Sequence, residues 1–371
     1  FRRVLFRSWV RSGTLSAQQL DVQKGVLTGK PVTLADGVAA DATTYASALS
    51  ASATGLLAYR SGMVNRRQLG WFDRMGHSEG ALSTADDTGI NSPNLSPDGR
   101  RVAAYRTVQG NTDIWLFDGT RTSRLTFDVA VDRFPVWSSD GSRIVFDSSR
   151  RVVRNMFVKD SSGAGNDELL LESTQANIPY DFSRDGRFLL YLSIDPRSDN
   201  DLWILPLGGD RKPWPFLKTE FGEANARFSP DTRWVAYQSN ESGRFEVYVR
   251  PFVAPGPDST TGRTAAGQWQ VSTAGGITPR WRADGRELYY IGPDGQMMAV
   301  RIDIAGPAPV VDAPVKLFDT HIYGGGVDNR LGTQFDVAPD GRFLINSVTD
   351  EVISPITLVQ NWQGGLSARE K

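Results

Sequence analysis

The chain has 371 residues, with 41 basic and 42 acidic side chains and no cysteine. The balanced charge excludes the basic surplus of a nucleic-acid-binding surface, and the lack of cysteine excludes disulfides, thiolate catalysis and cysteine-ligated metals. No apolar stretch approaches the ~18 residues of a membrane-spanning helix, whereas 37 Gly, 20 Pro and many short apolar runs indicate an all-β chain rich in turns.

The first eight residues, FRRVLFRS, are basic and apolar and fit no repeat in the rest of the chain. They match the translation of a sequencing-adapter end, so we expect residues 1–8 to be an assembly scar rather than native sequence. The alternative is a native N-terminal strand. With the scar set aside, we expect residues 9–366 to form a single domain and residues 367–371 a disordered tail.

One phrase recurs along the chain: an apolar or aromatic residue, a short linker, Asp-Gly, and then a short apolar strand. Gly supplies positive φ and Asp bonds to its own backbone, so each phrase predicts a tight turn between two strands. The turn aspartates are 42, 45, 46, 53 and 56 residues apart, close to the ~40–50-residue period of four-stranded propeller blades. The turns are Asp98–Gly99, Asp140–Gly141, Asp185–Gly186, Asp284–Gly285 and Asp340–Gly341, and Asp231–Thr232 is a sixth copy for which we expect a different turn geometry.

The two ends of the chain carry partial repeats. Residues 12–36 correspond to the third and fourth strands of a late repeat, and residues 50–61 form a degenerate copy of the phrase. Full blades are expected to begin near residues 45, 91, 133, 178, 224 and 277. One N-terminal strand and three C-terminal strands would complete a composite blade and hide the sheet edges. We therefore predict an all-β propeller of four-stranded blades, seven in number with eight as the alternative.

These repeats resemble the WD-like propeller repeats of the TolB type over residues 10–366. Longer phrases, such as RQLGWFDRMG at 67–76 and ESGRFEVYVRPF at 241–252, resemble the C-terminal propeller of bacterial membrane-associated Ser/Thr protein kinases. The resemblance implies a sensor or interaction domain on the extracytoplasmic side, joined to an upstream kinase domain. The chain has no Gly-rich loop, His-Arg-Asp loop or Asp-Phe-Gly motif, so kinase activity is not carried over to it.

Three short motifs could carry chemistry, but each has a simpler structural interpretation. GHSEG at 76–80 matches a nucleophile elbow with Ser78, yet no helical pattern follows it. The acidic run at 195–201 offers hard oxygen ligands but lacks EF-hand spacing, so a solvated loop is favoured. The two histidines of the chain cannot build a three-histidine zinc site. The weak metal candidates are Asp195, Asp199 and Asp201.

Two insertions, at 253–270 and 318–334, lengthen their repeats beyond the others. Loops on a rigid scaffold carry function more often than the scaffold itself, so we expect a ligand or protein partner to contact them. The alternative is tolerated variation in loop length. The expected binding residues are Arg263, Trp269, His321, Tyr323, Asp328 and Arg330.

The sequence favours a non-catalytic, monomeric propeller without a cofactor, which binds a protein or small ligand at its mouth. It predicts no nucleic-acid partner and no membrane insertion of this part of the chain. Two enzyme-related alternatives remain. One is the accessory propeller of a prolyl-oligopeptidase-type peptidase. The other is a propeller hydrolase or lyase, which would need acidic and amide side chains converging on a metal in the channel.

Overall fold

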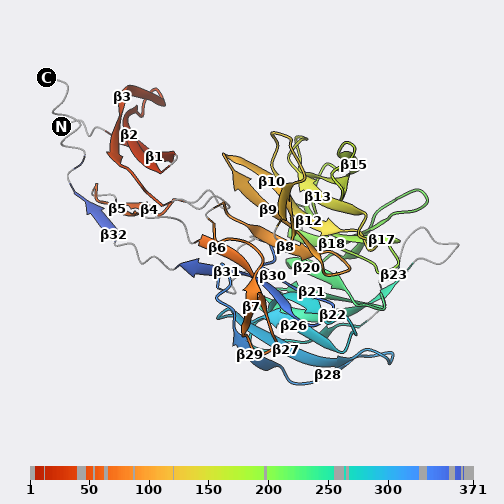
Figure 1. Ribbon diagram of the computed structural model, residues 1–371. Helices are drawn as coiled ribbons and strands as arrows, with labels where there is room; N and C mark the ends of the chain where they lie inside the picture. Colours follow the sequence, from red (N-terminus) through yellow and green to blue (C-terminus); the bar gives the residue numbers. More distant parts are fainter. Residues whose placement is uncertain are drawn as a thin grey trace. The chain divides into compact units, whose positions relative to one another are not determined.

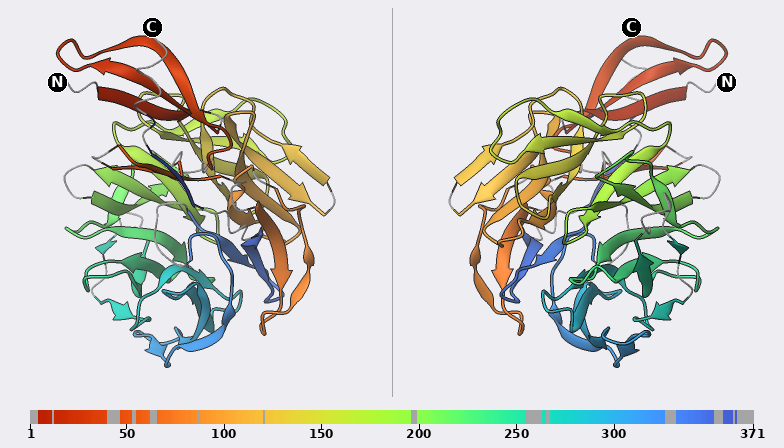
Figure 2. Two further views of the ribbon diagram at one scale, coloured as in Figure 1. Left: turned by 90° about the vertical axis from the view of Figure 1, so that its left-hand side faces the viewer. Right: turned by 90° about the vertical axis from the view of Figure 1, so that its right-hand side faces the viewer.

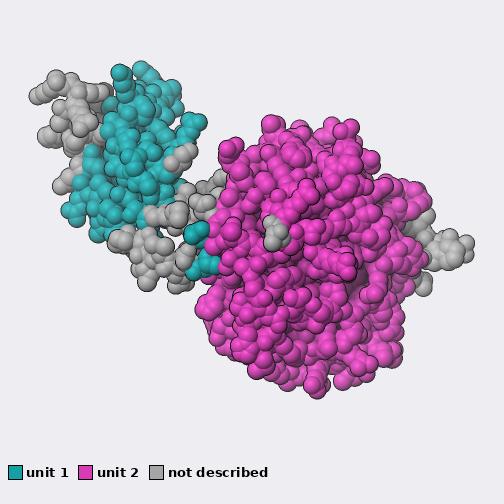
Figure 3. All heavy atoms as spheres, viewed as in Figure 1, with its two compact units in different colours: residues 1–66, 349–371 teal, residues 67–348 magenta. Residues whose placement is uncertain are grey.

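The computed structural model describes residues 5–11, 13–39, 47–52, 55–61, 66–86, 88–119, 121–195, 199–254, 263–264, 267–325, 332–350, 356–360 and 362. The chain divides into two compact units, which Figure 3 shows in different colours. Unit 1 comprises Phe1–Arg66 and Thr349–Lys371, and unit 2 comprises Arg67–Val348. None of the described helical segments is both long and apolar enough to cross a membrane.

Unit 2 consists of antiparallel sheets of four or five strands (Figures 1 and 2). Five of these sheets are each formed by strands that follow one another along the chain. Short apolar strands alternate with short turns, as the sequence predicts. Their strands are β8 Asn91–Leu95, β9 Arg101–Val108, β10 Asn111–Asp118 and β11 Arg121–Arg124; β12 Asp132–Trp137, β13 Arg143–Ser148, β14 Asn155–Asp160 and β15 Glu168–Leu171; β16 Ala176–Phe182, β17 Phe188–Asp195, β18 Asp199–Pro206 and β19 Trp214–Leu217; β20 Glu223–Phe228, β21 Trp234–Ser239, β22 Glu246–Val253, β23 Arg263–Thr264 and β24 Trp269–Gln270; and β25 Ile277–Trp281, β26 Glu287–Ile291, β27 Gln296–Asp303, β28 Val310–Val311 and β29 Val315–Asp319.

The sixth sheet joins segments from both ends of unit 2. Its order is β30 (Phe335–Val337), β31 (Phe343–Asp350), β6 (Arg66–Phe72) and β7 (Ser78–Ala81). A composite sheet is therefore present, but its N-terminal strands are β6 and β7 rather than one strand within residues 12–36, and it takes two strands from each end rather than one and three. The strand expected third in that blade, within residues 355–362, pairs elsewhere, so its predicted place was wrong.

The first strands of the six sheets contact one another in a closed cycle. β8 contacts β12, and the cycle continues through β16, β20, β25 and β30 back to β8. Six sheets thus close the ring among the described residues of unit 2, which establishes a β-propeller architecture. The expected count of seven blades is not confirmed.

Unit 1 holds two three-stranded sheets. One has the order β1–β2–β3, with bounds Leu5–Arg11, Thr14–Asp21 and Val26–Ala35; the other has the order β32–β5–β4, with bounds Ile356–Val359, Leu57–Arg60 and Leu49–Ala51. The degenerate repeat at 50–61 thus pairs with the C-terminal strand and supplies no sheet of the unit 2 ring. Leu5–Ser8, part of the expected scar, lies in β1 and pairs with β2. The foreign origin of residues 1–8 stays a prediction.

The Asp-Gly phrases form the tight turns between the first and second strands of their sheets. At Gly141, for example, φ is 71° and the amide donates a 2.9 Å hydrogen bond to the Ser138 carbonyl. Thr232 adopts the same geometry, with φ 61° and a 2.8 Å bond to the Ser229 carbonyl. The expected different turn at Thr232 was wrong, because the threonine takes the left-handed conformation and the hydrogen bond that glycine takes in the other turns.

The core of unit 2 lies between sheets. One cluster joins Leu190 and Ile204 of the third sheet to Val235 and Tyr248 of the fourth. Strands such as β21 are buried along their whole length on both faces. This explains why these strands are apolar without alternation: each face packs against a neighbouring sheet.

Candidate functional site

The first strand of four sheets is interrupted by a residue in the left-handed conformation. Ser92, Phe134, Asn225 and Thr278 have φ of 49°, 51°, 52° and 53°, and the strand register shifts at each of them. Such backbone costs a residue other than glycine about 1–3 kcal/mol and is concentrated at binding and active sites. A bulge also redirects the neighbouring side chains. The repeated bulge therefore marks the first strands, which meet around the axis of the ring, as the wall of a candidate site.

One position of each first strand contributes to a common hollow and lies four residues before the turn residue that marks its repeat. Its side chains are amide, apolar, acidic or basic, whereas the residue that follows is always apolar. The members of this set, which we call the channel ring, are Asn94, Val136, Asp181, Arg227, Arg280 and Asp336.

Acidic and amide members of the channel ring link several neighbouring sheets. In three cases, a side-chain oxygen of one first strand accepts the backbone N–H of the neighbouring first strand. The pairs are Asn94 Oδ1 with Trp137 N at 3.0 Å, Asp181 Oδ2 with Phe228 N at 2.8 Å, and Asp336 Oδ2 with Leu95 N at 2.8 Å. These bonds run between sheets that share no strand pairing, so the ring helps to hold the propeller closed.

Asp336 is the most heavily bonded member. Besides Leu95, its carboxylate accepts Arg280 Nε at 3.1 Å, the backbone N–H of Val337 at 3.0 Å and, more distantly, Asn94 Nδ2 at 3.4 Å. Arg280 is only 3 % exposed and donates its Nη1 to the carbonyl of Pro279 at 2.9 Å. The pair is therefore a buried ion pair with most of its hydrogen-bonding groups satisfied.

Two fully buried guanidinium nitrogens of the ring have no hydrogen-bond partner among the described residues. They are Arg227 Nη1 and Arg280 Nη2, both buried. Burial lowers the pKa of Arg280 to about 9, and the positive charge of Arg227 adds to the shift. Burial raises the pKa of Asp181 to about 6, although the charge of Arg227 opposes the shift.

The channel ring separates two hollows. The turn-side hollow, about 410 Å³, is lined by the whole ring and by residues of the turns, including Pro97, Pro230 and Pro339. The far-side hollow, about 200 Å³, is lined by Phe134, Tyr180 and other residues of the bulged segments. Because Asn94, Val136 and Arg227 line both hollows, they lie at the constriction between them.

The far-side hollow has its own buried charge. Arg154 lines it and pairs with Asp147, whose Oδ2 lies 2.6 Å from Arg154 Nη2. Burial raises the pKa of Asp147 to about 7, and the charge of Arg154 opposes that rise. Arg133 and Arg227 line it as well, among apolar and amide side chains, so this end of the channel favours an uncharged or anionic group over a cation.

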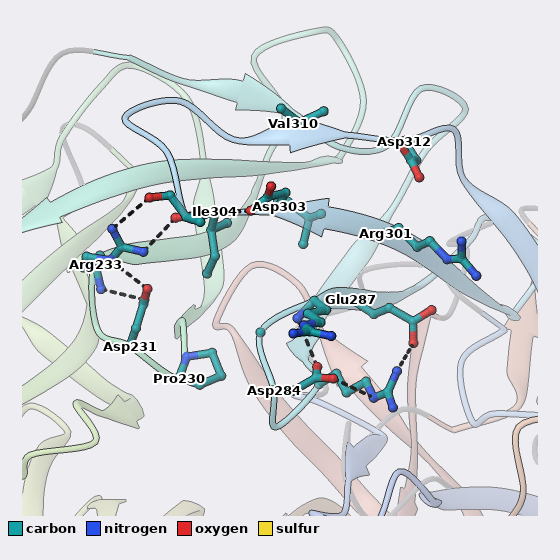
Figure 4. Close-up of a pocket in the computed structure, with 15 residues that line it drawn as sticks. Pro230, Asp231, Arg233, Asp284, Glu287, Arg301, Asp303, Ile304, Val310 and Asp312 are labelled. Carbon is teal, nitrogen blue, oxygen red and sulfur yellow. Dashed lines mark hydrogen bonds and ion pairs between the residues drawn. The ribbon is translucent and has the colours of Figure 1, made fainter.

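A third and larger hollow, of about 800 Å³, lies at the rim of the turn face (Figure 4). Arg233 bonds there to Asp231 at 2.7 Å and to the Ile304 carbonyl at 2.8 Å, and Arg282 pairs with Glu287 at 3.1 Å. These charges are paired within the hairpins or across the rim. The rim hollow is therefore a weaker candidate than the channel.

Comparison with known proteins fits this architecture. A family model described as the TolB beta propeller domain matches residues 78–244, which include four of the turn phrases. The chain carries a TolB-like β-propeller domain.

One solved structure supports the fold, and others resemble it more distantly. A protein described as TolB from Agrobacterium tumefaciens has a TM-score of 0.58 and 16% sequence identity, with 77% of this chain and 99% of that chain covered. TolB from Acinetobacter baumannii gives a TM-score of 0.43 at 13% identity, covering 95% and 79%. An oligogalacturonate lyase in complex with manganese gives 0.42 at 11%, covering 82% and 96%. A comparison with curated proteins found no match.

The two insertions lie in different places relative to the channel, and the first lies away from it. Within 253–270, β23 and β24 pair with β22, on the side of the sheet away from the channel. Trp269 packs edge-on against Trp234, with ring centroids 5.5 Å apart, as part of the blade core. Arg263 lies in β23, and its side chain is outside the described residues.

The second insertion returns to the channel at its end. Gly332 and Thr333 line the far-side hollow. His321 is exposed and left-handed, with φ 48°, and the ring of Tyr323 stacks under the Arg67 guanidinium, 3.3 Å from its centroid. Asp328 and Arg330 lie outside the described residues. The structure therefore brings neither Trp269 nor His321 into the channel ring, and their binding role stays a prediction.

Two aspartates of the acidic run at 195–201 form ion pairs with a lysine. The ammonium group of Lys218 lies 3.3 Å from Asp195 and 3.1 Å from Asp201, both of which are buried. Asp199 belongs to β18, and its side chain is outside the described residues. Among the residues that the structure describes, no three His, Asp or Glu side chains are placed to hold a metal ion.

Ser78 begins β7, an exposed strand at the end of the sixth sheet. Its neighbour His77 bonds to Asp73, with Nδ1 2.9 Å from Oδ2. The strand–turn–helix geometry that a nucleophile elbow requires is therefore not found at this serine.

Proposed function

We propose that the protein is a non-catalytic binding module whose TolB-like propeller receives a small ligand or a segment of a protein partner in its channel. The observation that supports this role is the channel ring. Its carboxylates are engaged by arginine or backbone donors, whereas Arg227 and Arg280 keep buried donors without a partner in the described chain. Groups that are held in place and can still donate are suited to binding.

The resemblance to kinase-associated propellers extends the proposal. It supports a sensor or interaction domain that forms the C-terminal part of a larger bacterial signalling protein, on the extracytoplasmic side of the membrane. Sequencing the gene upstream of the codon for Trp9 tests this part. A membrane helix and a kinase domain are expected there, and an α/β-hydrolase domain would overturn the signalling role.

A turnover assay tests the non-catalytic role. The full chain is incubated with an ester, an aldonolactone and an oligogalacturonate, each with and without added Mn²⁺ or Ca²⁺. Rates equal to the buffer rates are expected. Turnover that falls in an Asp181→Asn variant, but not in an Asp140→Asn variant of an exposed turn, would establish a channel enzyme and contradict the proposal.

A further inference from the structure

We infer that the turn-side hollow is a binding site for a carboxylate group, held by the guanidinium groups of Arg227 and Arg280, which line it. The inference rests on the proposed binding function and names the chemistry of its ligand. The carboxylate could belong to a small organic acid or to the C-terminus of a peptide.

The unpaired donors are the first line of evidence. Arg227 is 8 % exposed and Arg280 is 3 % exposed, yet Arg227 Nη1 and Arg280 Nη2 have no hydrogen-bond partner in the described chain. Buried donors in native proteins are almost always satisfied, and leaving one unmade is costly. Both side chains line the turn-side hollow, and the Arg227 guanidinium makes no hydrogen bond or ion pair with a described residue, so an anion in that hollow can neutralise its charge.

The charge of the ring selects the kind of anion. Arg227 and Arg280 are flanked in the ring by Asp181 on one side and Asp336 on the other, so the formal charge of these four residues is zero. A phosphate dianion would meet two carboxylates as well as these two guanidinium groups and that of Arg184, so the net charge of the lining is only +1. A carboxylate carries one charge and two coplanar oxygens, which matches two donors from neighbouring strands.

The walls of the hollow fit the rest of such a ligand. Prolines of three turns and the rings of Trp137, Phe182, Phe228 and Trp281 surround the charged members. Ligand sites of about 300–1,000 Å³ are typically apolar with a few convergent polar groups, and this hollow measures about 410 Å³. A short aliphatic or peptide chain that ends in a carboxylate satisfies both features.

Binding to the full chain at pH 7.5 tests the inference, with hexanoate, its neutral amide hexanamide and inorganic phosphate as probes in calorimetric titrations. Hexanoate is expected to bind at least tenfold more tightly than hexanamide or phosphate. Tetra-alanine with a free or an amidated C-terminus distinguishes a peptide end from a small acid. If neither hexanoate nor the free-acid peptide binds better than its neutral counterpart, water fills the hollow and the inference is wrong.

Variants of the two arginines test whether the carboxylate binds at the channel ring. Arg227→Lys and Arg280→Lys keep the charge but lose the planar fork, and each is expected to weaken hexanoate binding about tenfold. Arg286→Lys, an exposed arginine of the rim hollow, serves as the matched control and is expected to bind as the unmodified chain does. Unchanged affinity in both ring variants would overturn the assignment. If a ring variant fails to fold, the probe comparison on the unmodified chain still decides.

The outcomes separate this inference from the proposed function. Hexanoate binding without turnover supports both. Turnover of a bound carboxylate compound contradicts the non-catalytic role but leaves the carboxylate site standing. Absence of binding and of turnover overturns the carboxylate site and leaves a binding role for the loops.

Discussion

The turn aspartates and the channel ring both repeat once per sheet and share residue types, but they make different kinds of bonds. Asp140 bonds to Ser138 and Ser142 of its own hairpin, and these bonds lower its pKa to about 2. Asp181 is bonded to the next sheet, and burial raises its pKa to about 6. A turn that is satisfied locally specifies the hairpin, whereas a ring that depends on its neighbours closes the propeller and leaves donors for a ligand.

Replacement of Asp336 should produce the largest difference in stability between a channel-ring variant and a turn variant. In Asp336→Ala, Arg280 loses its counter-ion and the Leu95 N–H loses its acceptor, both inside the ring. Breaking a buried ion pair from one side costs about 3–5 kcal/mol of unfolding free energy. Urea unfolding of unit 2, followed by tryptophan fluorescence, measures the loss.

The matched control lies four residues further along the same hairpin. Asp340 accepts only from Arg342 and is exposed. Asp340→Ala should cost about 1 kcal/mol, the usual net value of a hydrogen bond. Equal losses in the two variants would mean that the channel ring contributes no more to stability than the turns do.

Replacement of Asp181 should change how stability depends on pH. In the folded chain its pKa is about 6, above the 3.8 of the unfolded chain, so the folded state holds a proton that the unfolded state has lost. The stability that this group contributes is therefore present below about pH 4 and is lost as the pH rises to about 6. Relative to the unmodified chain, Asp181→Asn should gain about 2–3 kcal/mol between pH 4 and pH 7, since the pKa shifts by about two units and one pKa unit corresponds to about 1.4 kcal/mol.

Asp140→Asn should have the opposite dependence of stability on pH. Its pKa is lowered, so its contribution is present above about pH 4 and is lost only as the pH falls toward 2. Between pH 4.5 and pH 7, this variant should run parallel to the unmodified chain in thermal unfolding. A constant offset for Asp181→Asn over the same range would show that its carboxyl group titrates as an exposed one.

Local chemistry explains what the sequence predicted well. Strand starts were expected near residues 91, 133, 178, 224 and 277, and the structure has them at Asn91, Asp132, Ala176, Glu223 and Ile277. Each start is tied to an Asp-Gly or Asp-Thr turn a few residues later. No local turn motif specifies how the ring closes. β31 pairs with β6, which is distant in sequence, and this pairing depends on contacts across the whole of unit 2.

The candidate site was missed although its signal is visible in the repeat. The position four residues before the turn aspartate reads Asn, Val, Asp, Arg, Arg, Asp in successive sheets, in a strand that is otherwise largely apolar. Polar residues of both signs at one repeat position indicate a shared polar surface. Long insertions stand out in a sequence, whereas one polar residue per repeat does not, so the insertions were predicted as the binding residues in place of the channel ring.

The smallest expected effect concerns the one turn without glycine. Thr232 is held at φ 61°, where its Cβ crowds the backbone, so Thr232→Gly should raise the unfolding free energy by about 0.5–1 kcal/mol after the greater chain entropy of glycine is subtracted. Thr232→Ala keeps the Cβ and should give no gain. The pair separates backbone strain from the loss of the 3.4 Å bond between the Arg184 N–H and Thr232 Oγ1.

A gain in Thr232→Gly without any change in hexanoate binding would place turn energetics and channel chemistry in separate parts of the propeller. In the described residues, Thr232 exchanges hydrogen bonds only with its own hairpin and with Arg184, whereas Arg280 is positioned by a bond between first strands. A glycine variant that lost stability would instead show that the Arg184 bond across sheets outweighs the strain. In that case the turns, like the channel ring, would contribute to closing the propeller.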